Sequence, residues 1–153
     1  MSRYASETSV SVANSKAEIE RIVERYGASQ FMSGWDASRA LIAFTMCERQ
    51  IRFILPMPAR DEKRFTHHSK GPRTPEAATK EWEQACRQRW RALALVIKAK
   101  LEAVESGISV FEDEFMANIV LPGGRTVSEE IRPRIAQAYE TRELPPLLPD
   151  YST

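Results

Sequence analysis

Apolar residues near the start of the chain recur with the period of a helix. In Ile19–Tyr26 they lie three and four positions apart, which predicts an amphipathic helix. Ser15 and Glu18 stand before this stripe with the spacing of a capping box, so we expect the helix to begin at Ser15 and to end at Gly27. The residues before Ser15 are polar and lack this period. Residues 1–14 are therefore expected to form a flexible arm.

The next segments alternate between apolar and polar residues with a period of two, as strands do. They are Ala28–Trp35, Arg39–Cys47 and Arg49–Leu55. Turn chemistry at Asp36 and a tight turn at Glu48 leave only short links between them, which predicts an antiparallel meander. One face of this sheet is apolar and needs a cover. The residues on that face are Ala40, Ile42, Phe44, Met46, Ile51, Phe53 and Leu55.

A long helix is expected over Thr74–Ser106. Thr74 as N-cap, Pro75 at the first position and Glu76 in the first turn are typical of a helix start, and Gly107 is suited to end the helix. An apolar stripe with a spacing of three and four runs along it and is expected to cover the sheet. The stripe consists of Trp82, Cys86, Trp90, Leu93, Ile97, Leu101 and Val104.

The pattern of the C-terminal part is less regular. Aromatic residues four apart favour a short helix from Val110, although Ile119–Leu121 also fits a strand that pairs back onto residues 125–127 across a Pro-Gly-Gly turn. Ser128–Tyr139 is predicted to be a helix, in which Pro133 either introduces a kink or marks a later start. Its inward-facing residues are expected to be Ile131, Ile135 and Ala138.

These elements predict an α+β fold with a single domain over residues 15–143. A three-stranded antiparallel meander packs on a long amphipathic helix (β-β-β-α), with an N-terminal helix and a helical C-terminal extension. Residues 144–153 are expected to form an extended, proline-rich tail. The length of 153 residues and the apolar fraction of 42% suit one globular domain. No apolar run approaches the roughly 20 residues of a membrane helix, and no secretory signal is visible, so we expect a cytoplasmic protein without a membrane partner.

Few residues carry catalytic or metal-binding chemistry. Cys47 and Cys86 are too few for a disulfide framework or a four-thiolate zinc site. His67 and His68 are adjacent, which suits a solvated or phosphate-contacting pair better than two ligands of one metal. Residues 112–114 are acidic but lie between two aromatic residues, which is typical of a surface turn over a core. We therefore expect no metal, no cofactor and no enzymatic activity.

The formal net charge of +1 hides a strong asymmetry along the chain. Residues 39–100 hold 14 basic and 6 acidic side chains, whereas residues 101–153 hold 4 basic and 10 acidic ones. A basic middle of this kind indicates nucleic acid or another polyanion as a partner. The alternative is that the basic and acidic parts attract each other within the fold or between subunits.

The basic residues define a candidate nucleic-acid site. Two arginines lie on or beside the third predicted strand, the loop over residues 59–73 holds five lysines and arginines, and a basic stripe on the long helix is expected opposite its buried face. Sheet, loop and helix would then line one groove, in which cations contact phosphates and an aromatic ring stacks on a base. A solvated helix face is the alternative. The candidate residues are Arg49, Arg52, Arg60, Lys63, Arg64, Phe65, Lys70, Arg73, Arg87, Arg91 and Lys98.

Two resemblances extend this picture. The segments QACRQRWRALALVIKAKLEAVESG and FEDEFMANIVLPGGRTV, with the terminal PPLLP, resemble uncharacterised small proteins of tailed bacteriophages and prophages. Over residues 15–107, the order of helix, meander and long helix is similar to the core of Rad52-type single-strand annealing proteins, which include phage recombinases. That resemblance implies a ring of subunits with single-stranded DNA in a basic groove between the sheet and the long helix.

The leading hypothesis is therefore a phage-encoded protein that binds single-stranded DNA or RNA as a homo-oligomer and anneals strands during recombination. A second hypothesis is a protein that inhibits or redirects a host defence or replication factor through its acidic C-terminal part or tail. A third is a structural or assembly component of the virion. The expected location is the cytoplasm of the host cell.

Overall fold

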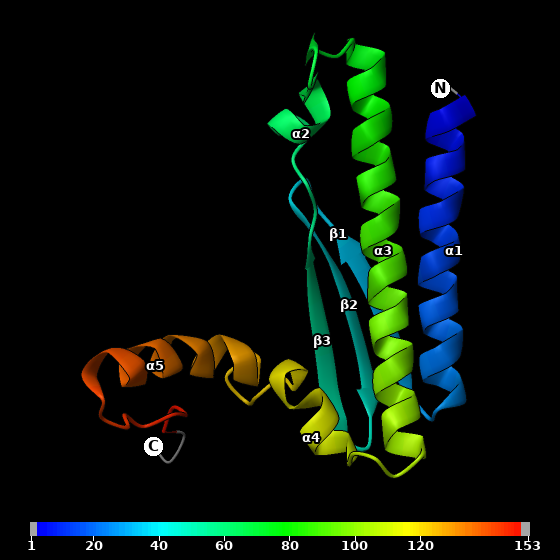
Figure 1. Ribbon diagram of the computed structural model, residues 1–153. Helices are drawn as coiled ribbons and strands as arrows, with labels where there is room; N and C mark the ends of the chain where they lie inside the picture. Colours follow the sequence, from blue (N-terminus) through cyan, green and yellow to red (C-terminus); the bar gives the residue numbers. More distant parts are fainter. Residues whose placement is uncertain (1–2, 151–153) are drawn as a thin grey trace.

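A long helix and a three-stranded antiparallel sheet run side by side along the molecule (Figure 1). The computed structural model describes residues 3–150, with side chains from Val12 to Asp150. The elements in chain order are α1 (Arg3–Arg25), β1 (Gln30–Trp35), β2 (Arg39–Met46), β3 (Arg49–Pro56), α2 (Lys63–Thr66), β4 (His67–His68), β5 (Gly71–Pro72), α3 (Pro75–Glu105), α4 (Phe111–Phe115), the 3-10 helix η1 (Met116–Asn118) and α5 (Val127–Thr141). The predicted α+β class is confirmed.

The meander has the predicted order β1-β2-β3 and its turns have the predicted chemistry. The Asp36 carboxylate accepts hydrogen bonds from the amides of Ser38 and Arg39 at 2.8 and 3.0 Å, which closes the first turn. Cys47 and Glu48 both adopt positive φ, 52° and 60°, and form the tight second turn. The first strand begins at Gln30, two residues later than expected, because the backbone at residues 27–28 is still bonded to the end of α1.

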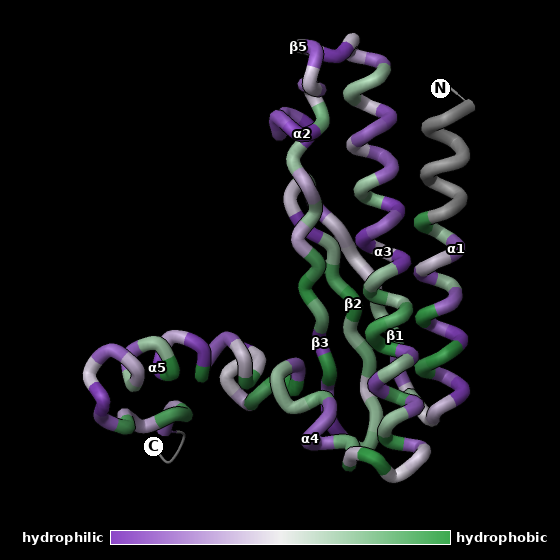
Figure 2. Tube along the Cα trace, in the orientation of Figure 1, coloured by the Kyte–Doolittle hydropathy of each residue, from purple (hydrophilic) through white to green (hydrophobic). Residues whose placement is uncertain are grey.

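Helices α1 and α3 lie parallel to each other and cover the same face of the sheet (Figure 1). The predicted apolar face of β2 and β3 is the buried one, and Trp90, Ile97 and Leu101 of α3 pack against it. Figure 2 shows this apolar band along β2, β3 and the lower half of α3. Phe44 of β2 and Phe53 of β3 stack at a centroid distance of 6.5 Å, which places the centre of the core at the middle of the β2–β3 hairpin.

Helix α1 corrects the expected boundary of the N-terminal arm. It begins at Arg3, so the prediction of a flexible arm over residues 1–14 is wrong for residues 3–14, and residues 1–2 lie outside the described part. Ser15 is inside the helix and does not cap it. No glycine or proline interrupts residues 3–25, and α3 offers a parallel neighbour along most of this length, which stabilises turns that lack an apolar stripe of their own (Figure 1).

The segment between β3 and α3 is more ordered than the expected loop. It contains α2 and the two short strands β4 and β5, and it folds over the first turns of α3 (Figure 1). The indole Nε1 of Trp82 donates a hydrogen bond to the Pro58 carbonyl at 2.7 Å. The Arg73 guanidinium donates to the carbonyls of Arg64 and Phe65 at 2.7 and 3.0 Å. These contacts hold residues 58–73 on the first turns of α3, at the end of the molecule away from the β2–β3 turn (Figure 1).

After α3 the sequence favoured a short helix from Val110 or a strand over Ile119–Leu121, and the structure contains part of each. Helix α4 follows Val110 and buries Phe111 and Phe115. The chain then extends the sheet, with Ile119 bridged to Ile51 of β3 and Val120 bridged to Thr126. Backbone pairing across the Pro-Gly-Gly turn therefore brings the start of α5 to the edge of the sheet.

Helix α5 is continuous through Pro133, so the proline does not mark its start. Proline lacks the amide that would bond the Glu129 carbonyl, and the Arg125 guanidinium donates to that carbonyl instead, at 3.1 Å. The expected inward packing of Ile131, Ile135 and Ala138 is wrong: no residue of α5 is buried, and the helix projects away from the body (Figure 1).

The residues after α5 turn back along it, and Arg134 donates a hydrogen bond to the Pro146 carbonyl at 2.9 Å. We call residues 127–150 the C-terminal arm. None of the helices in the described part of the chain combines the length and apolar content needed to cross a membrane.

Candidate nucleic-acid interface

The basic middle of the chain divides into three groups that occupy different parts of the surface. The first group surrounds α2 and the upper half of α3, which Figure 2 shows as strongly hydrophilic. We call it the basic tip. It consists of Arg60, Lys63, Arg64, Lys70, Arg73 and Arg89. Arg89 was not among the predicted site residues. We include it because it lies close enough to Glu62 for its charge to lower the pKa of that carboxyl group.

Two arginines of the basic tip lie over aromatic rings. The Cζ atom of Arg60 is 4.1 Å from the centroid of the Trp82 ring, and that of Arg64 is 4.4 Å from the Phe65 ring. Both arginines are exposed, so each rests on an apolar ring on one side and meets solvent on the other. Planar guanidinium groups held in this way are surfaces on which nucleobases stack.

The predicted stacking role of Phe65 itself is wrong. Its side chain is only 4% exposed, because α2 turns the ring toward α3 and Arg64 covers it. A base cannot reach this ring directly. Nothing in the sequence links Arg60 to Trp82 or Arg64 to a buried Phe65, since both contacts depend on how residues 57–73 fold back over α3.

The cations of the basic tip differ in how far they are already engaged. Arg73 is bonded to backbone carbonyls, and Arg64 forms an ion pair with Glu62. The hydrogen bond from Arg64 holds the pKa of Glu62 below its usual value. By contrast, Lys63, Lys70 and Arg89 are exposed, and within the described residues none of them lies within ion-pair distance of a carboxylate. These three cations are available to an anionic ligand.

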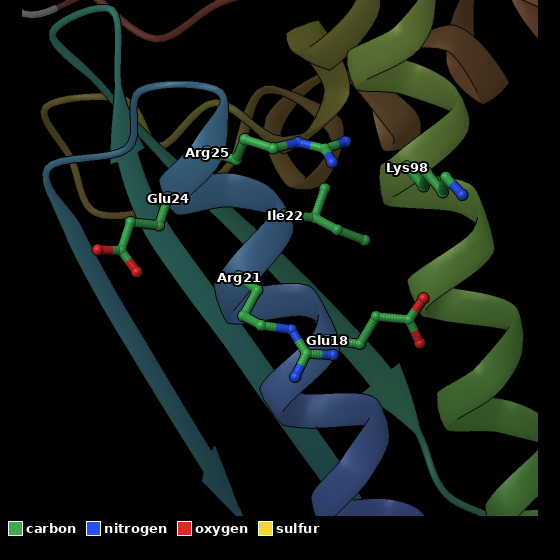
Figure 3. A pocket seen from close by; sticks show the side chains of 6 residues that line it. All are labelled: Glu18, Arg21, Ile22, Glu24, Arg25 and Lys98. Carbon is green, nitrogen blue, oxygen red and sulfur yellow. The ribbon is translucent and has the colours of Figure 1, made fainter.

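The second group lies in the seam between α1 and α3 and consists of Arg87, Arg91 and Lys98. These residues do not face away from the buried stripe as expected: at 3.6 residues per turn, Arg91 and Lys98 are only about 100° and 80° from Trp90. Helix α1 occupies that side. Lys98 and α1 residues line a surface groove there, shown in Figure 3: Glu18, Arg21, Ile22, Glu24 and Arg25.

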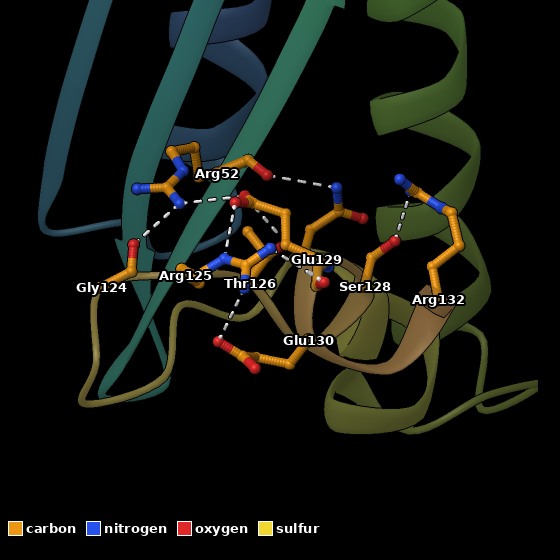
Figure 4. A network of polar contacts seen from close by, with 9 residues as sticks. Arg52, Gly124, Arg125, Thr126, Ser128, Glu129, Glu130 and Arg132 are labelled. Carbon is orange, nitrogen blue, oxygen red and sulfur yellow. Dashed lines mark hydrogen bonds and ion pairs between the residues drawn. The ribbon is translucent and has the colours of Figure 1, made fainter. Parts of the chain in front are cut away.

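The third group, the two arginines of β3, is paired with the acidic C-terminal part. Arg49 contacts Glu112 at 3.0 Å. Arg52 lies on the sheet face away from α3, where it donates to the Gly124 carbonyl at 2.9 Å and to Glu129 at 3.1 Å (Figure 4). The prediction that these two arginines contact phosphates is therefore not supported, and attraction between the basic and acidic parts within the fold is confirmed for these pairs.

The expected common groove between sheet and helix is not formed by these residues. Helix α3 packs directly on the sheet, and Phe44, Phe53, Trp90 and Ile97 fill the space between them. The predicted site residues are thus separated into the basic tip, the seam and the β3 pairs. Within the described part of the chain, Lys63 and Lys70 at the tip and Lys98 in the seam are exposed and lie beyond ion-pair distance of a carboxylate.

The histidine and cysteine residues considered for metal binding or catalysis have structural surroundings. The Nδ1 atom of His68 accepts a hydrogen bond from the Lys70 amide at 3.0 Å. Burial raises the pKa of the Cys86 thiol, as expected for a core residue. Among the described residues, no three histidine, cysteine or carboxylate side chains gather as metal ligands would.

Comparison with known proteins adds no assignment to this geometry. The chain matches no protein-family model, no curated protein and no solved structure.

Proposed function

We propose that this protein binds single-stranded nucleic acid through the basic tip. The observation that carries the proposal is the pair of guanidinium groups, Arg60 over Trp82 and Arg64 over Phe65, beside the unpaired cations Lys63, Lys70 and Arg89. Cations pair with phosphates along a strand, and flat cationic surfaces stack on unpaired bases. A duplex keeps its bases stacked on each other and offers the tip only its phosphates, so a single strand is the favoured ligand.

The biological role within this proposal is strand annealing during phage recombination, in the cytoplasm of the host cell, with no catalytic step. The order of helix, meander and long helix supports this role. The proposed contact surface differs from the groove that the annealing-protein resemblance implies. Inhibition of a host protein and a place in the virion stay alternative proposals, and the exposed apolar residues of the C-terminal arm favour a protein partner at that end of the molecule.

Fluorescence anisotropy with single- and double-stranded oligonucleotides across a salt series tests the proposal. For single strands, each neutralised phosphate contact contributes about −0.7 to the slope of log affinity against log salt. The Lys63→Gln/Lys70→Gln variant should therefore flatten the slope by about 1.4 and weaken binding for every sequence. Both side chains are exposed and form no side-chain hydrogen bond or ion pair within the described residues, so folding should not change.

The matched control is Arg21→Gln/Arg25→Gln, which removes two charges from exposed positions near the opposite end of α1. It should leave the slope nearly unchanged. A second variant, Arg60→Lys, keeps the charge but removes the planar group; it should weaken binding to single strands at a constant slope. No binding by the wild type at low salt, or equal effects of the tip and control variants, would contradict the proposal.

A further inference from the structure

The C-terminal arm presents apolar side chains to solvent: Ile135 and Tyr139 are exposed, and Ile131 is half-buried. Ile131, Ile135 and Tyr139 lie four positions apart and so share one side of α5. Ile135 is 48% exposed and Tyr139 is 85% exposed, and Leu144 in the returning tail is 79% exposed. A contiguous apolar stripe in solvent is typical of a protein contact surface.

The sheet carries a second uncovered apolar surface. We define its outer face as the side away from α1 and α3, where every second residue of each strand points. An antiparallel sheet with one face on the core is expected to be polar on the other, but here Met32 and Ile54 are exposed and Leu41 is half-buried. A cleft on this face has a mixed lining: Leu41, Ile54 and Pro56 from the strands are apolar, whereas Arg39, Arg52 and Glu129 are charged. Ser128 and Arg132 from the first turns of α5 also line it.

We propose that two copies of this chain form a dimer in which the C-terminal arm of each copy lies on the outer face of the sheet of the other. The exchange is reciprocal, so a two-fold axis closes the assembly and covers both apolar surfaces of both chains. The proposal concerns surfaces separate from the basic tip, and it does not rest on nucleic-acid binding.

The first turns of α5 border the outer face of their own sheet, and the contacts that hold them direct the rest of the arm away from it (Figure 1). Glu129 contacts Arg52 of β3 at 3.1 Å and Arg125 at 3.7 Å, and Glu130 contacts Arg125 at 3.4 Å (Figure 4). Together with the pairing of Val120 with Thr126, these contacts direct α5 outward from the edge of β3 (Figure 1). The arm of a second copy can reach the outer face without breaking them.

Length and charge also fit a second copy. Fifteen helical residues span about 22 Å at 1.5 Å each, and the eight residues of β2 or β3 span about 26 Å at 3.3 Å each. Glu140 and Glu143, near the far end of α5, are exposed and without an ion pair in the described part of the chain. Arg39 at the end of the outer face is exposed as well, with a single ion pair, to Asp36 at 3.7 Å. Opposite charges therefore stand at the ends of two matching surfaces.

Light scattering and mass photometry of the full chain test the dimer. The wild type should be dimeric at micromolar concentration, and Ile135→Glu/Tyr139→Glu should be monomeric, with dimerisation weakened at least tenfold. Because α5 buries no residue in its own subunit, circular dichroism of the variant should match that of the wild type. The control is Leu95→Glu, an exposed apolar position on α3 outside both surfaces, which should stay dimeric. A monomeric wild type, or a dimer that survives the arm variant, would overturn the proposal.

A disulfide between chains tests which surface receives the arm. In a Cys47→Ser background, one preparation carries Met32→Cys and a second carries Tyr139→Cys, and the two are mixed and oxidised. A disulfide-linked heterodimer should form, because the two cysteines are on different molecules. A persistent dimer that yields no linked species would show that the arm docks elsewhere, and would overturn the assignment to the outer face.

Discussion

Arginine takes three different roles in this protein, and its neighbours decide which. Arg52 is held between a carbonyl and a carboxylate on the sheet, Arg60 rests on an indole ring, and Arg91 is exposed on α3. All three belong to the same basic segment, so charge counting cannot separate them. Only the unengaged and ring-stacked arginines are suited to a nucleic-acid ligand, since a phosphate would have to displace Glu129 from Arg52.

The Arg52–Glu129 contact makes stability depend on pH. Partial burial alone would raise the pKa of Glu129, but hydrogen bonds from Arg52 and Thr126 outweigh it and hold the pKa below the ordinary 4.5. A lowered pKa in the folded state stabilises the protein at neutral pH, and this contribution disappears as the pH falls from about 4.5 through the lower folded value. Glu129→Gln should therefore cost about 1 kcal/mol at pH 7 in urea unfolding, and the difference from the wild type should close in acid.

The control for this prediction is Glu112→Gln. Its partner Arg49 is equally close, but both side chains are about half exposed, and such surface pairs contribute little. A gap between wild type and Glu129→Gln that persists unchanged below the folded pKa would mean that the side-chain shape, and not its charge, matters.

At the scale of elements, α3 is the helix against which both α1 and the sheet pack. Trp90 is 2% exposed and sits between α1 and the sheet, with the ammonium of Lys16 5.0 Å from the ring centroid. Trp90→Ala should cost about 3–5 kcal/mol, because it removes a large buried side chain and leaves a cavity. Leu95→Ala, five residues further along the same helix but 61% exposed, should cost far less. Thermal and urea unfolding followed by circular dichroism compare the two, and equal losses would contradict the observed facing of the helix.

At the scale of the whole molecule, basic and acidic residues gather toward opposite ends. The basic tip lies at one end of α3, while acidic residues gather around α4 and on the arm near the other end, where part of the basic charge is already neutralised by Glu112, Glu114 and Glu129. A polyanion approaching this protein is therefore drawn to the tip rather than to the protein as a whole.

This arrangement predicts that the seam between α1 and α3 contributes little to nucleic-acid binding. Lys98 shares its groove with the carboxylates Glu18 and Glu24 of α1, which compete with any phosphate. Arg91→Gln/Lys98→Gln should thus change the salt slope of single-strand binding by less than one contact, about 0.7. A change as large as that of the Lys63→Gln/Lys70→Gln variant would show instead that the strand continues from the tip along the seam.

Several features of the fold could be predicted because short-range physics decides them. The strands β2 and β3 follow from alternation, the turn at Asp36 follows from a side chain that bonds its own backbone, and α3 begins where Thr74 caps it. Each of these depends on residues only a few positions apart. The buried stripe of α3 from Cys86 to Leu101 and the facing of the sheet could be predicted for the same reason, since a helix and a strand each have a fixed period. Trp82, which the predicted stripe also included, is half-buried outside the core, where it contacts Pro58 and Arg60 instead of the sheet.

The tertiary structure decided what depends on distant partners. Residues 3–14 are helical although they lack a stripe, Phe65 is covered rather than exposed, and Arg52 is paired with a carboxylate 77 positions away. Helix α5 shows the limit most clearly: its amphipathic pattern predicted an inward face, yet none of its residues is buried in the fold. A pattern specifies which side of an element prefers to be buried, but the surface that buries it is set by the path of the whole chain, or by a second molecule.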